Sequence, residues 1–354
     1  MDKPIGVGLI GFGMAGRVFH APVIACVPEL KLAKIVTGKT EAASLAASKY
    51  PDTEVVSDYK KLFEDDQISL IVVATPNTSH AKLASEALEA GKHVVVEKPF
   101  TVTSSDADDL IRLAEKRKRI LTVHQNRRWD SDFQTVKKVI ENKLIGNIAE
   151  YEAHYDRFRN RIKENAWREV NQPGSGMVYD LGSHLIDQAL SLFGLPESVT
   201  ADIRTQRRGG PVDDAFEIIL HYKGLKVTLK SGMLVREPLP RYIILGDKGS
   251  FVKYGTDVQE EALKMGKSPA DDENWGSEPE SIWGVLNTEI EGLNFRGKIE
   301  SIKGDYRKFY KNTADSVSGR ESPVVSAQDG RNTIRIIELA FESSRAGRTM
   351  AFKQ

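Results

Sequence analysis

A lysine stands at the end of an apolar run in the segment HVVVEKPF, residues 93–100. An unbroken run of valines is typical of a strand buried on both faces of a parallel sheet. Because such sheets bind ligands outside the carboxyl ends of their strands, this strand would place Lys98 in a cleft. Burial and a neighbouring positive charge both lower the pKa of a lysine, so we predict that Lys98 transfers protons near neutral pH. The alternative is that the strand simply reaches the surface there.

Asp180 and His184 form a second candidate for proton transfer, in the segment GSGMVYDLGSHLIDQAL. Gly174 and Gly176 break any regular structure before this point, and a helix is predicted to begin near Asp180. The spacing of four then places both side chains on one helical face. A histidine with a carboxylate one turn away is a usable general base. The alternative is a capping aspartate beside an ordinary histidine, but a nucleotide motif and Lys98 in the same chain favour catalysis.

The glycine pattern GFGMAG, residues 11–16, matches G-x-G-x-x-G between a predicted strand and a predicted helix. Its three glycines would allow a tight turn, the approach of a pyrophosphate and close helix packing. The start of the helix would bind phosphates with its free N–H groups. An ordinary turn is the alternative, and the context favours a dinucleotide site. The predicted cofactor-binding residues are Gly11, Phe12, Gly13, Met14, Ala15, Gly16, Thr37, Lys39, Thr75, Pro76, Asn77, His80, Glu97 and Lys98.

The end of the second predicted strand, KIVTGKT, indicates which dinucleotide is bound. NAD enzymes usually place an acidic residue there to accept a hydrogen bond from the ribose 2′-hydroxyl. No carboxylate lies between Lys31 and Thr40, whereas Thr37 and Lys39 suit a 2′-phosphate. We therefore predict NADP(H) as the preferred cofactor, with NAD(H) as the alternative if Lys39 is only a solvated turn residue.

The elements that would position these residues fall into two groups. Strand and helix patterns alternate through residues 1–125, which predicts a Rossmann-type parallel sheet with helices on both faces. Residues 126–354 predict an α+β domain with a large, mostly antiparallel sheet for substrate binding and oligomerisation, including hairpins near Lys223-Gly224 and Asp247-Gly249. Residues 256–305 lack periodicity and are predicted to be a long ordered insertion. A final helix at about 332–346 could pack back on the first domain.

Bulk composition excludes several classes of protein. Lys and Arg number 50 and Asp and Glu number 50, a balance that argues against nucleic acid as a partner. Cys26 is the only cysteine, which excludes an intrachain disulfide or a multi-cysteine metal site. The histidines show no metal-ligand spacing, so no metal is predicted. Because neither a signal segment nor a membrane-spanning run is present, we expect a cytoplasmic protein.

Polar residues at the predicted domain junction and on the first strand of the second sheet could contact a substrate. For Tyr155 and Arg157 a role in the core or at the surface is at least as well supported, and Arg128 could equally be an exposed arginine at a helix start. The predicted substrate-binding residues are Lys98, Asn126, Arg127, Tyr155, Arg157, Asp180 and His184.

Together these motifs resemble the glucose-fructose oxidoreductase/inositol dehydrogenase (Gfo/Idh/MocA) family. The matching stretches are GFGMAG followed by HAPVI, then ATPNTSH, VVVEKPF, HQNRRWD, DLGSHLID and LGDKGSF. The resemblance implies a Rossmann domain, a second domain with an antiparallel sheet, and oxidation or reduction of a secondary alcohol on a sugar or cyclitol. It identifies Lys98 with the family's E-K-P lysine, and Asp180 and His184 with its D-x-x-x-H pair.

Within the family, HQNRRWDSDF, WREVNQPGSGMVYDLGSHLIDQAL and TDVQEEALKMGKSP look most like an NADP-dependent scyllo-inositol dehydrogenase. Thr37-Gly38-Lys39 departs from the Ser-Arg often found at the adenosine ribose. The resemblance to this subgroup implies a small polyol or sugar substrate, with scyllo-inositol as the first choice. It also implies a homo-oligomer, either a dimer or a tetramer. The alternatives are another sugar or aldehyde reductase of the family, or a non-enzymatic dinucleotide-sensing regulator.

Overall fold

The computed structural model describes residues 3–162 and 169–353. Trp167 and Arg168, which begin one of the stretches used for the resemblance, lie outside the described residues. The chain forms two compact units. The first contains residues 1–126, 259–275 and 305–331, and the second contains 127–258, 276–304 and 332–354. The segments 259–275 and 305–331, which the sequence placed in the second domain, thus cluster with the first.

The first unit is built on a six-stranded parallel sheet with strand order β3-β2-β1-β4-β5-β6. This order is that of a Rossmann domain, which confirms the predicted fold. The central strands are buried on both faces, as their apolar runs predict. The strands are β1 Ile5–Ile10, β2 Leu30–Val36, β3 Glu54–Val56, β4 Ile68–Val73, β5 His93–Val96 and β6 Leu121–Val123.

Helices connect these strands, and α5 begins at a capping residue. The longest of those in residues 1–126 is α5, Ser104–Arg117, capped by Thr103, whose hydroxyl accepts from the Asp106 N–H at 3.1 Å. Its acidic first turn and basic last turn suit the helix dipole. The others are the π-helical η1 Gly16–His20, α1 Ala21–Ile24, α2 Thr40–Lys49, α3 Lys60–Phe63, the 3₁₀ turn η2 Asn77–Ser79 and α4 His80–Glu89.

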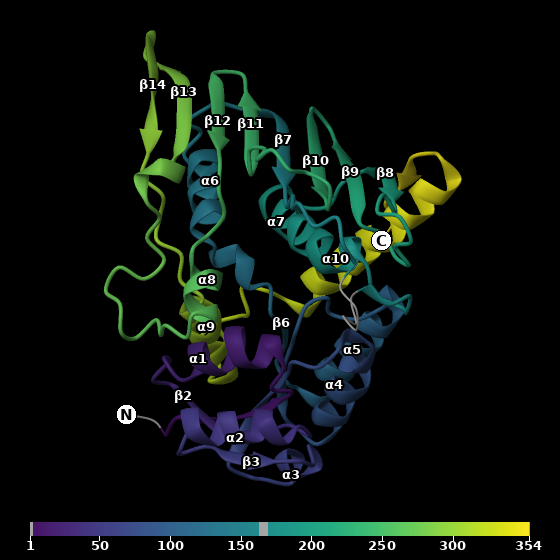
Figure 1. Ribbon diagram of the computed structural model, residues 1–354, viewed down its shortest axis with the longest axis vertical. Coiled ribbons are helices and arrows are strands. Elements are labelled where there is room, and N and C mark those ends of the chain that lie inside the picture. Colours follow the sequence, from purple (N-terminus) through teal and green to yellow (C-terminus); the bar gives the residue numbers. More distant parts are fainter. Residues whose placement is uncertain (1–2, 163–168, 354) are drawn as a thin grey trace. The chain divides into compact units, whose positions relative to one another are not determined.

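The second unit is built on a nine-stranded sheet with order β14-β13-β12-β11-β7-β10-β9-β8-β15 (Figure 1). Its pairs are antiparallel except for β7 with β10, so the sheet is mixed and mostly antiparallel, as predicted. The strands are β7 Ile148–His154, β8 Ser198–Arg204, β9 Ala215–Tyr222, β10 Leu225–Gly232, β11 Tyr242–Gly246, β12 Gly249–Lys253, β13 Gly284–Ile290, β14 Leu293–Ile299 and β15 Met350–Ala351.

The helical segments from residue 126 onward include the one that carries Asp180 and His184. The π-helical η5, Val178–Gly182, continues directly into α7, Ser183–Phe193, and both pack against β10. The last helix, α10, begins five residues before its predicted start. Besides these, the structure has η3 Asn126–Trp129, α6 Ser131–Glu141, α8 Gln259–Lys264, η6 Glu280–Ile282, α9 Arg307–Val317 and α10 Ala327–Ala346.

Residues 256–305 contain regular structure that was not predicted from their sequence. They include α8 and the hairpin of β13 and β14, which extends the second sheet at one edge (Figure 1). Most of β14 is exposed, yet its sequence LNFRGKI alternates apolar and polar residues, so the period of two that indicates a strand was present and was overlooked. Among the described residues, no helix combines the length and the apolar character that crossing a membrane would require.

Candidate functional site

The glycine turn after β1 has the conformation that its sequence predicts. Gly11 has φ +103°, and a Cβ on it would lie 2.6 Å from the Ala74 carbonyl oxygen. A Cβ on Gly16 would lie 2.1 Å from the Gly11 carbonyl oxygen, so close packing of the following helix excludes a side chain. A Cβ on Gly13, by contrast, would have no heavy atom within 4 Å. Packing within the protein therefore does not require a glycine at position 13. A glycine there is consistent with a turn whose backbone approaches a pyrophosphate.

Thr37 and Lys39, the two predicted ribose-end residues, differ in exposure. Thr37 is half-buried, with its N–H bonded to the Val56 carbonyl at 3.1 Å, while Lys39 is exposed at the start of α2. Around the glycine turn, Met14 is 46% exposed, whereas Phe12 is buried and packs edge-on against Tyr50. Phe12 can therefore offer a cofactor only its backbone.

The segment after β4 is held by its own hydrogen bonds. Thr75 Oγ1 and Ser79 Oγ lie 2.7 Å apart, and Pro76 is exposed. His80 is buried, with Nδ1 2.9 Å from the Pro99 carbonyl and Nε2 2.9 Å from the Thr75 carbonyl. Both ring nitrogens of His80 thus face the chain itself, and Asn77 is likewise buried.

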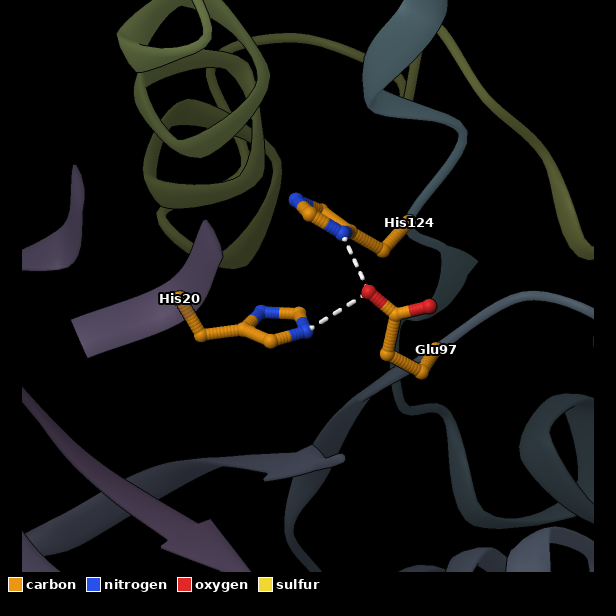
Figure 2. Close-up of side chains that lie close together, drawn as sticks. All are labelled: His20, Glu97 and His124. Atoms are coloured by element: carbon orange, nitrogen blue, oxygen red, sulfur yellow. Dashed lines mark hydrogen bonds and ion pairs between the residues drawn. The ribbon is translucent and has the colours of Figure 1, made fainter. Parts of the chain in front are cut away.

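Lys98 is half-buried directly after β5, and Glu97 beside it is part of a buried cluster (Figure 2). Glu97 Oε1 lies 3.0 Å from His20 Nε2 and 2.9 Å from His124 Nδ1. The other ring nitrogen of His20 is hydrogen-bonded to the Tyr310 hydroxyl. His20 ends η1, Glu97 follows β5 and His124 follows β6, so one carboxylate connects three elements of the first unit.

The protonation states in this cluster follow from burial. Burial alone would raise the pKa of Glu97, but the hydrogen bonds from His124 and His20 outweigh it and hold the pKa well below its usual value. Burial, and then repulsion from His124, lower the pKa of His20 to about 4. Burial raises the pKa of Tyr310. Near neutral pH, therefore, a neutral His20 donates from Nε2 to the Glu97 carboxylate and accepts at Nδ1 from the Tyr310 hydroxyl.

The same three residues could in principle hold a metal ion, since their ligand atoms all lie within 4.8 Å of one another. Sequence spacing could not detect this cluster, because His20 and His124 lie 77 and 27 positions from Glu97. One nitrogen of each imidazole, however, points at Glu97 Oε1 at an ordinary hydrogen-bond distance (Figure 2). Hydrogen bonds alone account for the arrangement.

In the second unit, Asp180 lies in η5 and His184 is the second residue of α7. His184 is buried and Asp180 is half-buried. The chain enters this helix through Gly176, which has φ +92°, and the Asp180 N–H donates to the Gly176 carbonyl at 3.1 Å. π-helical turns are rare and occur frequently at functional sites. Both π-helical segments of the described chain, η1 and η5, carry predicted site residues.

Buried polar contacts fix α7 one turn beyond His184. The Arg128 guanidinium binds the Asp187 carboxylate through two hydrogen bonds of 2.8 and 2.7 Å. Gln188 donates to the Arg127 carbonyl at 2.9 Å and accepts from the Tyr242 hydroxyl at 3.0 Å. The Arg128 side chain is only 11% exposed in this pair, so it is not a surface residue.

Asp213 holds the turn that precedes η5. Its Oδ2 accepts from the Val178 N–H at 2.8 Å, and a Cβ on Gly176 would lie 1.9 Å from its Oδ1. Burial raises the pKa of Asp213 to about 6, against the lowering effect of its backbone hydrogen bonds. The sequence did not single out this residue.

Replacing Asp213 with asparagine is expected to stabilise the protein at alkaline pH. Because the folded-state pKa of Asp213 lies above the usual value, stability falls as pH rises from about 4 to about 6, and the full cost persists above that range. Asparagine keeps an acceptor for Val178 but never ionises. At pH 8 the variant should gain roughly 1–3 kcal/mol in denaturant unfolding, and almost nothing at pH 4. As a control, Asp214→Asn should destabilise, since Asp214 accepts from Arg207 Nε at 2.8 Å. Equal behaviour of the Asp213 variant at both pH values would contradict the prediction.

The remaining predicted substrate residues are differently placed. Tyr155 is 6% exposed, its hydroxyl lies 3.3 Å from Asp130 Oδ2, and the guanidinium of Arg241 lies 3.7 Å from its ring centre. The guanidinium of Arg127 also lies over this ring, at 5.2 Å. Asn126 is buried, and Arg157 is half-buried with its backbone bonded to Gly232 and Val235. Tyr155 and Arg127 thus belong to a packed cation–π cluster in the second unit.

Known proteins are similar to this chain in sequence and fold over nearly its whole length. The chain is 40% identical over 347 residues to scyllo-inositol 2-dehydrogenase (NADP(+)) IolW of Bacillus subtilis, covering 98% of this chain and 95% of that protein. It is 44% identical to a protein of Escherichia coli named "Uncharacterized oxidoreductase YdgJ", covering 99% of each. The crystal structure of an oxidoreductase from Bacillus cereus superposes with a TM-score of 0.91 at 33% identity, covering 99% of both chains.

Two domain families match in the same order. Residues 5–125 match the one described as "Oxidoreductase family, NAD-binding Rossmann fold", and residues 137–352 match the one described as "Oxidoreductase family, C-terminal alpha/beta domain". Together they include both η1 and η5 with their predicted site residues. The chain belongs to the Gfo/Idh/MocA family of oxidoreductases and uses a nicotinamide cofactor.

Proposed function

We propose that this oxidoreductase interconverts a secondary alcohol of a cyclitol and its ketone, with scyllo-inositol and scyllo-inosose as the substrate pair and NADP(H) as the cofactor. The observation that carries the proposal is the 40% identity, over 98% of the chain, to a protein named for that substrate and cofactor. The complete set of Lys98, Asp180 and His184 supports catalysis. A dinucleotide-sensing regulator would not need all three.

The preference for NADP(H) is supported by the end of β2. Thr37 and Lys39 offer a hydroxyl and an ammonium group there, and no carboxylate lies between residues 31 and 40 to repel a 2′-phosphate. The turn at Gly11, Gly13 and Gly16 would hold the pyrophosphate. When bound, the nicotinamide accepts or donates a hydride at its C4 atom.

The protein residues supply proton transfer and orientation. We assign to His184 the removal of the proton from the substrate hydroxyl during oxidation, with Asp180 stabilising the imidazolium that forms. Lys98 polarises the same oxygen and relays the proton, and the roles reverse when the ketone is reduced.

A rate assay at the nicotinamide absorbance band tests the proposal, with NADP⁺ or NAD⁺ and with scyllo-inositol, myo-inositol and glucose. We expect turnover of scyllo-inositol, faster with NADP⁺. Activity confined to glucose or another sugar would retain the mechanism and refute the substrate. Cofactor binding without turnover of any alcohol would refute the enzymatic proposal in favour of a regulator.

Substitution of Lys39 tests its contact with the 2′-phosphate of NADP⁺. Lys39→Ala should raise KM for NADP⁺ about tenfold and leave KM for NAD⁺ within about twofold, because only the phosphorylated cofactor loses a charge partner. Lys31 is an exposed lysine at the other end of the same strand, so Lys31→Ala is the matched control and should change neither value. A parallel rise in both KM values for Lys39→Ala would contradict a 2′-phosphate contact.

A further inference from the structure

We propose that Glu97 is a positioning residue for Lys98, and that His20 and His124 hold it in place. This inference rests on the proposed proton-transfer role of Lys98. It concerns a carboxylate that the reaction itself does not use, placed directly before the lysine in the chain.

The first support is the geometry around Glu97. His20 Nε2 and His124 Nδ1 lie 3.0 and 2.9 Å from the same oxygen, Oε1, and approach it from two sides (Figure 2). Since an ionised carboxylate only accepts hydrogen bonds, both imidazoles must donate. His20 and His124 are 0% and 1% exposed, so a donor that lost this acceptor would have no water to replace it. The carboxylate is therefore fixed in one orientation.

The second support is that the donors are themselves fixed. The Tyr310 hydroxyl donates to His20 Nδ1, which keeps the His20 proton on Nε2, where it faces Glu97. Tyr310 is fully buried and packs edge-on against Phe309, while Phe309 also contacts the His124 ring. The segment 305–331, which carries Tyr310, thus reaches the end of β5 through one hydrogen-bonded chain.

The third support is a restraint on the other side of Lys98. His80 Nδ1 lies 2.9 Å from the Pro99 carbonyl, and the Glu97 N–H donates to the Val73 carbonyl at 2.9 Å. The backbone of Lys98 is consequently held both before and after the residue. A displacement of about 1 Å in a reacting group can lower a rate about 100-fold. Restraining the backbone of Lys98 would therefore protect the rate of the proposed proton transfer.

Two substitutions at Glu97 separate position from charge. Glu97→Ala removes the acceptor, and we expect kcat to fall 10- to 100-fold while the dissociation constant of the cofactor stays within about threefold. Glu97→Gln keeps an Oε1 that can accept both hydrogen bonds, so its kcat should be at least about threefold higher than that of Glu97→Ala. Equal losses in the two variants would overturn the inference, because they would show that charge, not position, is what matters.

A double variant tests whether Glu97 acts through Lys98. In a Lys98→Met background, Glu97→Ala should cause no further loss of kcat, since nothing remains to be positioned. A further loss of tenfold or more would assign Glu97 another role and overturn the inference. If Lys98→Met alone turns over normally, the proposed function fails; if it is inactive but Glu97→Ala is not, only this inference fails.

His93 provides the structural control. It lies at the opposite end of β5, and its Nδ1 accepts from the Ile120 N–H at 3.0 Å without contacting Glu97. His93→Gln should leave kcat unchanged, even if the melting temperature falls. If Glu97→Ala does not fold, His124→Phe keeps the ring and removes one donor, and its kcat should fall at least threefold. Full activity of a folded His124→Phe enzyme, or activity that a chelator abolishes and zinc restores, would also overturn the inference.

Discussion

Replacing Lys98 with methionine is expected to lower kcat about 1,000-fold while leaving the dissociation constant of the cofactor within about threefold. Methionine preserves most of the length and the apolar stem of the side chain but removes the ammonium group. Lys98 is half-buried at the end of β5, so the fold should tolerate the change. Stopped-flow turnover and fluorescence titration of the reduced cofactor would measure the two quantities. Near-normal turnover would end the proposed mechanism.

Lys92 is the matched control for this experiment, because it flanks the same strand at the other end. It is 7% exposed, and its ammonium group donates to the Asp65 and Ile68 carbonyls at 2.8 Å each. Lys92→Met removes a lysine that ties the chain together, so the expected loss is in stability and not in kcat. Loss of turnover in both variants, with equal loss of stability, would indicate that Lys98 is also structural.

The first unit could be predicted from sequence because its signals are local. Buried parallel strands read as apolar runs, and the glycines of the first turn form a short motif between a strand and a helix. The same holds for the hairpin at Lys223-Gly224, which the pairing of β9 with β10 confirms. In each of these cases, neighbouring residues carry enough information to define the element.

Two elements with local sequence signals were missed. The β13–β14 hairpin turns at Glu291-Gly292, where both residues have positive φ, and the residues of β14 alternate between apolar and polar as LNFRGKI. Positive φ at two successive turn residues is typical of a two-residue hairpin, so this dipeptide was the signal available. The helix α9 was also missed, although its buried residues Phe309, Tyr310 and Thr313 follow a helical spacing.

Candidate site residues could be proposed from sequence where they coincide with motifs and not elsewhere. Lys98, Asp180 and His184 are recognisable because each follows a strand end or a helix start that the sequence marks. Glu97 was assigned to the cofactor, and no spacing rule could connect it with histidines in two other elements. Asp213 was invisible for the same reason, since its partner Val178 lies 35 positions away. Buried polar networks are tertiary features, and one sequence contains no record of them.

Breaking the ion pair between Arg128 and Asp187 is expected to lower the free energy of unfolding of the second unit by about 3–5 kcal/mol. The two side chains are 11% and 2% exposed and meet through two hydrogen bonds, so Asp187→Ala strands a guanidinium in a buried place. Asp109→Ala is the control, because Asp109 and Arg112 are 68% and 67% exposed in their pair and should contribute less than about 1 kcal/mol.

Hydrogen exchange should locate the effect of Asp187→Ala in α7, which carries His184 three residues before Asp187. Faster exchange of the α7 amides, with β1 and β4 unchanged, would show that the pair anchors this helix. The double variant Arg128→Met/Asp187→Leu removes both charges, and should be less destabilised than Asp187→Ala because no unpaired charge remains buried. The double variant could instead be less stable than both the unmodified protein and Asp187→Ala. The attraction between the two charges would then hold α7 in place, and not the cost of leaving one charge buried without a partner.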